Sequence, residues 1–252
     1  EIFSSVTITV NPLPVVSISG LSTNHCLNDA PVALTGTPGG GVFSGPGVTG
    51  NTFDPVLAGV GGPYTVTYNY TDPVTGCSNY STQQVTVIAL PVVSFTGLAS
   101  QYCLNASTVI LAGSPSGGIF SGPGITGNTF NPAAAGIGGP YNITYSYTDP
   151  DSGCGNSSTQ QVTVNALPTV NISGLADTIC MGNSTSITLA FTGTGPWNYS
   201  VNNGPIESSP VNTVLFPVNP TVTTTYEVTT LHDANCNAGI WESVAAGSYH
   251  VL

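Results

Sequence analysis

The sequence predicts an all-β protein made of tandem antiparallel β-sandwich domains, one disulfide each, in an extended rod. Three observations lead to this prediction. A unit of 77 residues recurs along the chain, as repeat architectures do. Each copy alternates β-branched or aromatic residues with polar ones, which is typical of half-buried strands. The six cysteines fall two per copy.

The repeat defines the expected domains. Residues 13–89 and 90–166 align without gaps and are identical at 50 of 77 positions. A third copy, residues 167–252, begins with the same Leu-Pro pair but has diverged and lacks the Phe-Ser-Gly-Pro-Gly segment. We therefore expect two closely similar sandwich domains followed by a divergent one.

Residues 1–12 fit the same scheme. The run from Val6 to Pro12 aligns with the strand sequence that precedes each later Leu-Pro pair. It is therefore expected to be the last strand of an upstream repeat, which makes this chain a fragment of a longer array. The alternative is a short N-terminal strand of the first domain.

Each copy reads as a series of short strands. Residues 64–70 alternate strictly, and residues 141–147 repeat the pattern. Gly, Pro, Asn and Asp clusters punctuate the strands every 8–12 residues or so. About six or seven short strands in some 77 residues are typical of an Ig-like sandwich. A parallel β-helix would need a rung period of roughly 20–29 residues, which the sequence lacks.

The cysteines predict disulfides. Six cysteines allow 15 pairings, and the repeat symmetry favours one bond per copy. Such a bond closes a loop of ~50 residues, contributes about 4 kcal/mol, and indicates an oxidising, extracellular destination. We expect it to tie two loops at one end of each sandwich. Metal binding is disfavoured, because there is no CxxC and no recurring His. The predicted pairs are Cys26 with Cys77, Cys103 with Cys154, and Cys180 with Cys236.

Composition excludes several functions. The chain has no Lys or Arg and 11 acids, for a formal net charge of −11. Nucleic-acid binding and polybasic membrane contacts need cations, so neither is expected. No segment approaches the ~20 apolar residues of a membrane helix, and no signal-peptide pattern opens the chain. The expected partners are neighbouring repeats, surface glycans or other copies of the chain.

Two glycine- and acid-containing motifs have plain structural interpretations. Residues 45–50 and 122–127 fit G-x-G-x-x-G, but Pro55 follows the first and no helix is expected there, so both are interpreted as turns.

Residues 72–76 and 149–153 are Asp-Pro turns. Calcium is the alternative for these turns, chiefly the second, where oxygens alternate. No other cofactor is expected.

No catalytic constellation is evident. His25, His232 and His250 do not recur between copies, and no G-x-S-x-G elbow is present. We interpret these histidines as solvated or turn residues and the chain as not an enzyme. Trp197 and Trp241 suit a sandwich core, with sugar stacking as the alternative. The tyrosine pairs that lie two apart should face the core.

The repeat motifs resemble a known family. G-x-F-S-G-P-G-[VI]-T-G-N-T-F-x-P, then G-G-P-Y-x-[VI]-T-Y-x-Y-T-D, then G-C-x-N-x-S-T-Q-Q-V-T-V-x-A-L-P cover the first two copies. They resemble the PKD-like or Ig-like repeats of very large Bacteroidota surface proteins, similar to gliding-motility adhesins exported by type IX secretion. The resemblance implies an extracellular, cell-surface location and O-glycosylation at Asp177-Thr178-Ile179, on Thr178. It carries over no catalytic residues.

The expected function is a stalk or adhesive segment of a secreted cell-surface adhesin, serving gliding or surface attachment. One alternative is a self-assembling filament, sheath or surface-layer protein, since low charge weakens repulsion between chains. The other is an accessory carbohydrate-binding region of a secreted hydrolase, which predicts an exposed aromatic stripe.

Overall fold

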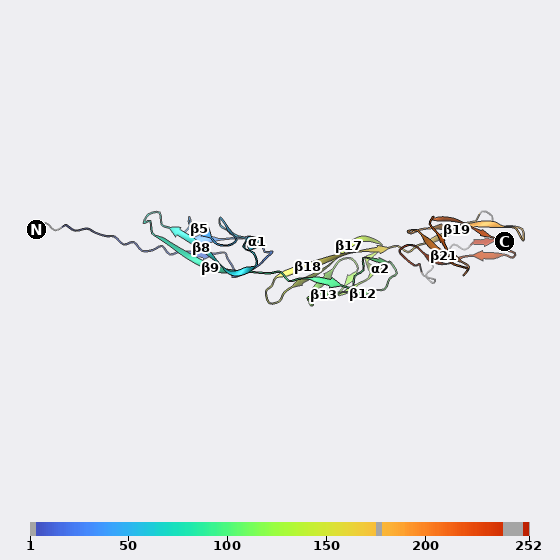
Figure 1. Cartoon of the computed structure of the whole chain (residues 1–252), viewed down its shortest axis with the longest axis horizontal. Coiled ribbons are helices and arrows are strands. Elements are labelled where there is room, and N and C mark those ends of the chain that lie inside the picture. Colours follow the sequence, from blue (N-terminus) through green and yellow to red (C-terminus); the bar gives the residue numbers. More distant parts are fainter. Residues whose placement is uncertain (1–3, 175–177, 239–248, 252) are drawn as a thin grey trace. The chain divides into compact units, whose positions relative to one another are not determined.

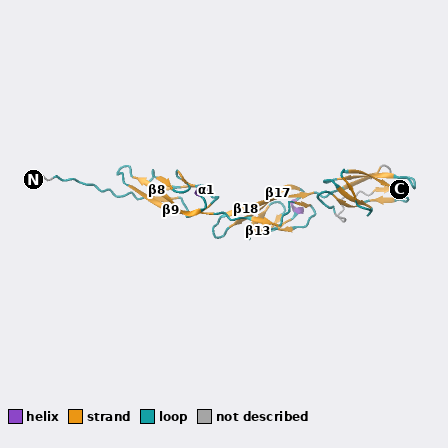
Figure 2. Cartoon of the chain, viewed as in Figure 1, coloured by secondary structure: helices purple, strands orange, loops and turns teal. Residues whose placement is uncertain are grey.

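Strands account for nearly all the regular structure. The computed structural model describes residues 4–174, 178–238 and 249–251 (Figure 1). Helix is confined there to two single turns, α1 (Pro55–Ala58) and α2 (Pro132–Ala135), as Figure 2 shows. The all-β prediction is confirmed. Within these residues no helix is long and apolar enough to cross a bilayer.

The first copy is built on a four-stranded sheet in the order β2-β9-β8-β5. Its long hairpin places alternate side chains inward, so Val66, Tyr68, Val85 and Val87 are buried around Phe53. The strands of this sheet are β2 (Asn24–Cys26), β5 (Val42–Ser44), β8 (Gly61–Thr71) and β9 (Ser78–Ile88). Two smaller sheets are β1 (Ser17–Ser19) with β4 (Thr35–Thr37), and β3 (Val32–Ala33), β7 (Thr52–Phe53) and β6 (Val48–Thr49).

One pairing departs from the antiparallel pattern. Strand β2 runs parallel to β9, with Asn24 opposite Thr86 and Cys26 opposite Ile88. The second copy repeats this parallel pairing between β11 (Gln101–Cys103) and β18 (Gly155–Asn165). In these two copies the first cysteine therefore lies beside the C-terminal end of the last strand of its copy.

The second copy has the same arrangement, with a sheet in the order β11-β18-β17-β14. Its strands are β11 (Gln101–Cys103), β14 (Ile119–Ser121), β17 (Gly138–Thr148) and β18 (Gly155–Asn165). The smaller sheets are β10 (Ser94–Thr96) with β13 (Ala112–Ser114), and β12 (Val109–Ile110), β16 (Thr129–Phe130) and β15 (Ile125–Thr126).

The third copy packs its strands around a different core. Trp197 stacks on Phe191 with ring centroids 6.0 Å apart, and both are buried with Tyr199. Its sheets are β19 (Val170–Gly174), β20 (Thr185–Phe191) and β23 (Thr213–Val218); β22 (Glu207–Ser209), β21 (Trp197–Val201) and β25 (Val228–His232); and β24 (Thr224–Tyr226) with β26 (Tyr249–Val251).

The inward tyrosines are held by their hydroxyls as well as their rings. The Tyr145 hydroxyl donates to the Pro115 carbonyl oxygen at 2.6 Å and accepts from Gly118 N–H at 2.8 Å. Tyr68 makes the same pair of bonds in the first copy. The prediction that the paired tyrosines face the core is confirmed for Tyr68 and Tyr145, and Tyr70 packs half-buried against the same core as Tyr68.

The chain divides into two compact units: residues 1–93 with 146–156, and residues 94–145 with 157–252. The division gives the tip of the β17–β18 hairpin to the first unit. The predicted domain boundaries stay a prediction. Residues 4–12 carry no strand, and Val6, Ile8 and Val10 are 81–87% exposed.

The glycine-rich segments form turns, as expected. Residues 45–50 make turns on either side of the two-residue strand β6 and lead from β5 to β7, not directly into a helix. The expectation that no helix starts near Pro55 is wrong, however. Asp54 caps a single helical turn by accepting from Val56 N–H at 2.9 Å, and Pro55 suits the first helical position.

Candidate functional site

The cysteines form the most distinctive constellation of the chain. Cys26 is bonded to Cys154 and Cys103 to Cys236, across 128 and 133 residues of sequence. Both bonds join the first cysteine of one copy to the second cysteine of the next. Disulfides of this kind are typical of oxidising, extracellular compartments.

The predicted pairing within each copy is wrong, and the sheet explains why. Cys26 lies opposite Ile88, the last residue of β9, whereas Cys77 comes immediately before Ser78, the first residue of that strand. Eleven strand residues separate the two ends by roughly 35 Å. A disulfide needs Cα atoms within about 7 Å. In the first copy, and in the second with the same register, the two cysteines therefore lie at opposite ends of the sandwich, not at one end.

An aspartate organises the turn that carries each second cysteine. Asp149 Oδ1 accepts from the backbone N–H groups of Asp151 and Ser152 at 2.9 and 3.0 Å. These two bonds lower the pKa of the Asp149 carboxyl, because they favour its charged form. The turn closes with Asp149 N–H donating to the Cys154 carbonyl at 3.0 Å.

The other two second-position turns use the same device. Asp72 Oδ1 accepts from Val74 and Thr75 N–H, which lowers the pKa of the Asp72 carboxyl in the same way. Asp233 Oδ1 accepts from Asn235 and Cys236 N–H. The aspartates of the Asp-Pro turns thus bind backbone, which explains the motif without a metal.

The first cysteines also share a turn. The residue three positions further along donates its backbone N–H to the carbonyl of Cys26, Cys103 and Cys180 at 3.0, 2.9 and 3.0 Å, respectively. Asp29 additionally accepts from the Cys26 N–H at 2.9 Å. All six cysteines therefore sit in preformed turns of two kinds.

Two cysteines have no sulfur partner in the described structure. Cys77 is half-buried and Cys180 is exposed. By contrast, the bonded second-position cysteines, Cys154 and Cys236, are only 0% and 5% exposed. We expected all six cysteines to be bonded. Because each bond joins a first cysteine to the second cysteine of the next copy, Cys77 and Cys180 are left without a partner among the described residues.

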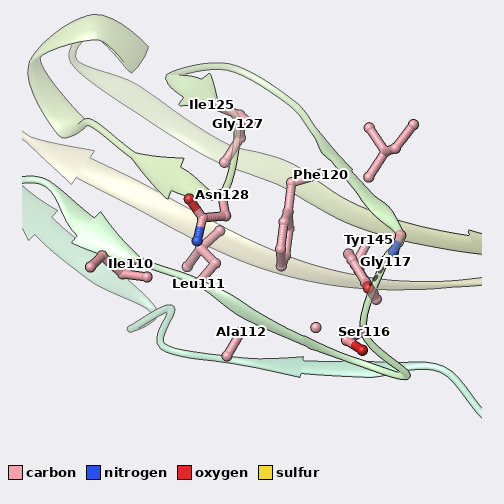
Figure 3. A pocket seen from close by; sticks show the side chains of 13 residues that line it. Ile110, Leu111, Ala112, Ser116, Gly117, Phe120, Ile125, Gly127, Asn128 and Tyr145 are labelled. Carbon is pink, nitrogen blue, oxygen red and sulfur yellow. Dashed lines mark hydrogen bonds between the residues drawn. The ribbon is translucent and has the colours of Figure 1, made fainter.

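A shallow hollow of about 660 Å³ lies in the second copy (Figure 3). In Figure 3 the Phe120 ring stands between Leu111 and Tyr145, and Asn128 and Ser116 supply polar groups. Its lining contains no acid, histidine or cysteine. Its hydroxyls are those of Ser116 and Tyr145; the lining offers no acid or histidine to activate them, and the Tyr145 hydroxyl already bonds Pro115 and Gly118.

The remaining candidate residues are structural or untested. His25 is buried at 8% exposure, with Nδ1 3.4 Å from Asp29 Oδ2, so its interpretation as a solvated or turn residue is wrong. It lies on β2 with its ring centroid 5.7 Å from that of Phe53. His232, half-buried, ends β25. His250 lies on β26, and its side chain is not described.

One of the two tryptophans is a core residue, whereas the other and the predicted glycosylation site are not tested by the structure. Trp197 is 6% exposed and donates from Nε1 to the Thr192 carbonyl at 2.8 Å, so it is a core residue. Trp241 lies outside the described residues. Thr178 is exposed, and its predicted glycosylation stays a prediction, since Asp177 lies outside the described residues.

Two observations concern the metal-binding and carbohydrate-binding alternatives. Among the described residues, no group of three or more His, Cys, Asp or Glu side chains could hold a metal ion. Tyr80, 64% exposed, is the only exposed aromatic among the residues whose burial is described. One exposed ring does not make the stripe that the carbohydrate-binding alternative predicts.

Comparisons with known proteins give only distant likeness. No protein-family profile and no curated protein matches the sequence. Solved structures similar to this chain include the ICAM-5 ectodomain fragment, with TM-score 0.41 and 12% identity over 94% of this chain and 76% of that one. An I-band fragment from titin gives 0.37 and 12%, covering 94% of this chain and 96% of that one. The N-terminal four Ig domains of Dscam1 isoform 8.4 give 0.29 and 11%, covering 94% and 72%.

Proposed function

We propose that this chain is a non-catalytic stalk or adhesive segment of a secreted cell-surface adhesin, of the kind its repeats resemble in Bacteroidota. The observation that carries the proposal is the pair of bonds Cys26–Cys154 and Cys103–Cys236. Each bond spans a Leu-Pro junction between copies. Force applied along the chain is therefore carried at each junction by a disulfide as well as by the backbone.

The bonds limit how far the chain extends under tension. With both intact, the shortest covalent path runs from residue 1 to Cys26, across to Cys154, back to Cys103, and across to Cys236 and the C-terminus. That path contains about 95 residues, or roughly 330 Å fully extended, against about 880 Å for all residues in series. A tether that stays short after its domains unfold suits a surface-attachment role.

Single-molecule force spectroscopy on the whole chain, held at its two ends, tests the proposal. We expect a maximum extension near the shorter length in the oxidised protein and near the longer one after reduction. Bonds within each copy would give nearly the same extension, since their shortest path contains about 97 residues, so the double variant Cys77→Ser, Cys180→Ser is measured as well. Bonds between copies keep the short extension in that variant, whereas bonds within copies would leave Cys103–Cys154 alone and lengthen it to roughly 700 Å. The longer value would remove the support for a force-bearing stalk.

Attachment is tested separately. Beads coated with the oxidised chain should bind glycan-coated surfaces or whole cells more than beads coated with a β-sandwich protein of similar charge. Regular sheets or filaments formed by side-by-side contact, seen by negative-stain electron microscopy, would favour the surface-layer alternative instead.

A further inference from the structure

The hollow in the second copy plays no part in the disulfide-linked stalk. It measures about 660 Å³, within the range of ~300–1,000 Å³ that is usual for small-molecule sites. Its lining is mostly apolar and contains few polar side chains, which is also the usual composition of such sites. The size and the lining of this hollow therefore suit a small ligand.

An aromatic ring is accessible in the hollow. Phe120 is half-buried, whereas the equivalent Phe43 of the first copy is only 6% exposed and belongs to the core. Two neighbouring rings hold Phe120 in place: it lies edge-on to Phe95, with centroids 5.3 Å apart, and tilted against Tyr145, with centroids 4.5 Å apart. A ligand therefore meets an aromatic surface that is already ordered.

Two polar side chains accompany this ring. Ser116 and Asn128 both line the hollow, and both are exposed. In the view of Figure 3 they lie on either side of Phe120. Within the described part of the chain, neither the Ser116 hydroxyl nor the Asn128 side-chain amide bonds another protein group. Both side chains are therefore free to donate to a ligand and to accept from it.

The charges of the chain favour an uncharged ligand. The lining of the hollow contains no acid and no histidine, and the chain has no Lys or Arg. An anion would find no positive side chain in the hollow and would meet a protein with a formal net charge of −11. A cation would find no carboxylate there. Recognition in this hollow rests on apolar contact and neutral hydrogen bonds.

We propose that this hollow binds a neutral sugar ring. A pyranose has an apolar face of C–H groups that packs on the Phe120 ring, and hydroxyls at its edge that bond Ser116 and Asn128. A fatty chain would use neither polar side chain and would stay partly in water, because the hollow is shallow. The inference deepens the proposed attachment role and rests on it for its purpose: it names the kind of group recognised and the place.

The first copy supplies matched replacements for the lining. Three lining residues of the second copy differ from their counterparts 77 positions earlier: Ile110, Ala112 and Ser116 stand where the first copy has Ala33, Thr35 and Gly39. The triple variant Ile110→Ala, Ala112→Thr, Ser116→Gly therefore introduces side chains that the same fold already accommodates. It removes an apolar wall and one of the two free polar groups while keeping Phe120.

Two-dimensional NMR on the whole oxidised chain tests the proposal. The probes are the methyl glycosides of glucose, galactose and N-acetylglucosamine, with cyclohexanol as an apolar ring of similar size and glucuronate as a charged sugar. We expect a neutral glycoside to shift the amide resonances of Gly117 and Asn128 with millimolar affinity, as suits a ligand of about a dozen heavy atoms. Cyclohexanol and glucuronate should bind roughly ten-fold more weakly.

The variants locate the binding. Phe120→Leu and the triple variant should each weaken it by about ten-fold, whereas Phe43→Leu, at the equivalent ring of the first copy, should leave it unchanged. Urea unfolding shows that each variant is folded. The proposal is overturned if no glycoside shifts these resonances at up to about 100 mM, if cyclohexanol binds as tightly as the sugars, or if Phe120→Leu or the triple variant binds normally. None of these results would alter the extension measured under force, and an unexpected extension would leave the sugar titration standing.

Discussion

Cys26 and Cys154 lie 5.5 Å apart at their Cα atoms, although 128 residues of sequence separate them. Cys77, much nearer in sequence, lies at the far end of the strand that Cys26 flanks. The disulfides of this chain therefore connect copies rather than closing each one. Covalent linkage between copies is a property of the array and of no single domain.

Peptide mapping under non-reducing conditions is expected to recover Cys26 linked to Cys154 and Cys103 linked to Cys236. Trypsin is of no use because the chain has no Lys or Arg, so cleavage must rely on the aromatic residues and the acids. Peptides that link Cys26 to Cys77 would contradict the strand register. A reduced and alkylated sample provides the control.

Gly36→Ala is expected to destabilise the protein by about 1–3 kcal/mol, the range seen for overpacked cores. A methyl group at Gly36 would overlap the buried Tyr68 ring. Gly39→Ala is the matched control, because a methyl group there meets no atom within 4 Å. Urea unfolding measures both variants, and equal midpoints would show that the ring does not pack on Gly36.

Tyr199 is expected to titrate far above an ordinary tyrosine. Burial, the Glu207 charge and the hydrogen bond to Glu207 Oε2 at 3.2 Å raise its pKa from 10.0 to about 12. Because the folded pKa is the higher one, its stabilising effect is complete below pH 10 and is lost as pH rises towards 12.

Ultraviolet absorbance of the phenolate follows this titration. Tyr199→Phe should remove the highest transition, and Glu207→Gln should move it to lower pH. Tyr80→Phe, at an exposed site, should leave it in place. An unchanged high-pH transition in Tyr199→Phe would assign it to another tyrosine.

Acid is expected to loosen the turn that carries Cys154. The pKa of Asp149 lies below its ordinary value of 3.8, because its carboxylate accepts two backbone N–H groups. The stabilisation is therefore complete above that value and is lost as pH falls through the lower folded pKa. The protection of the Asp151 and Ser152 amides against hydrogen exchange, measured relative to intrinsic exchange at the same pH, should fall in that range.

Asp149→Ala should produce the same faster exchange at neutral pH, because it removes the acceptor altogether. Asp149→Asn keeps an acceptor oxygen and should remain close to the parent while losing the acid dependence. Asp151→Asn is the control, since the Asp151 carboxylate accepts neither bond. Unchanged exchange in Asp149→Ala would mean that the turn holds without its aspartate.

The sequence was sufficient wherever local pattern governs. Alternation between Tyr64 and Tyr70 placed Val66 and Tyr68 on the buried face, because successive strand residues point to opposite sides. Turn chemistry correctly reduced the G-x-G-x-x-G segments to turns. The one-turn helix at Pro55 was missed, because a single capped turn has no period to detect.

The cysteine pairing could not be predicted from the sequence, for a different reason. Two cysteines per copy were visible, but repeat symmetry fits bonds within copies and bonds between consecutive copies equally well. The parallel pairing of β2 with β9 decides between them, since it places Cys26 at the end of β9 opposite Cys77. His25, on β2, is buried with its ring beside Phe53, which the sequence also did not indicate. The sequence thus determined the strands, their faces and the turns, which depend on neighbours along the chain. Only the tertiary structure decided which thiols meet, because that depends on which ends of which strands lie together.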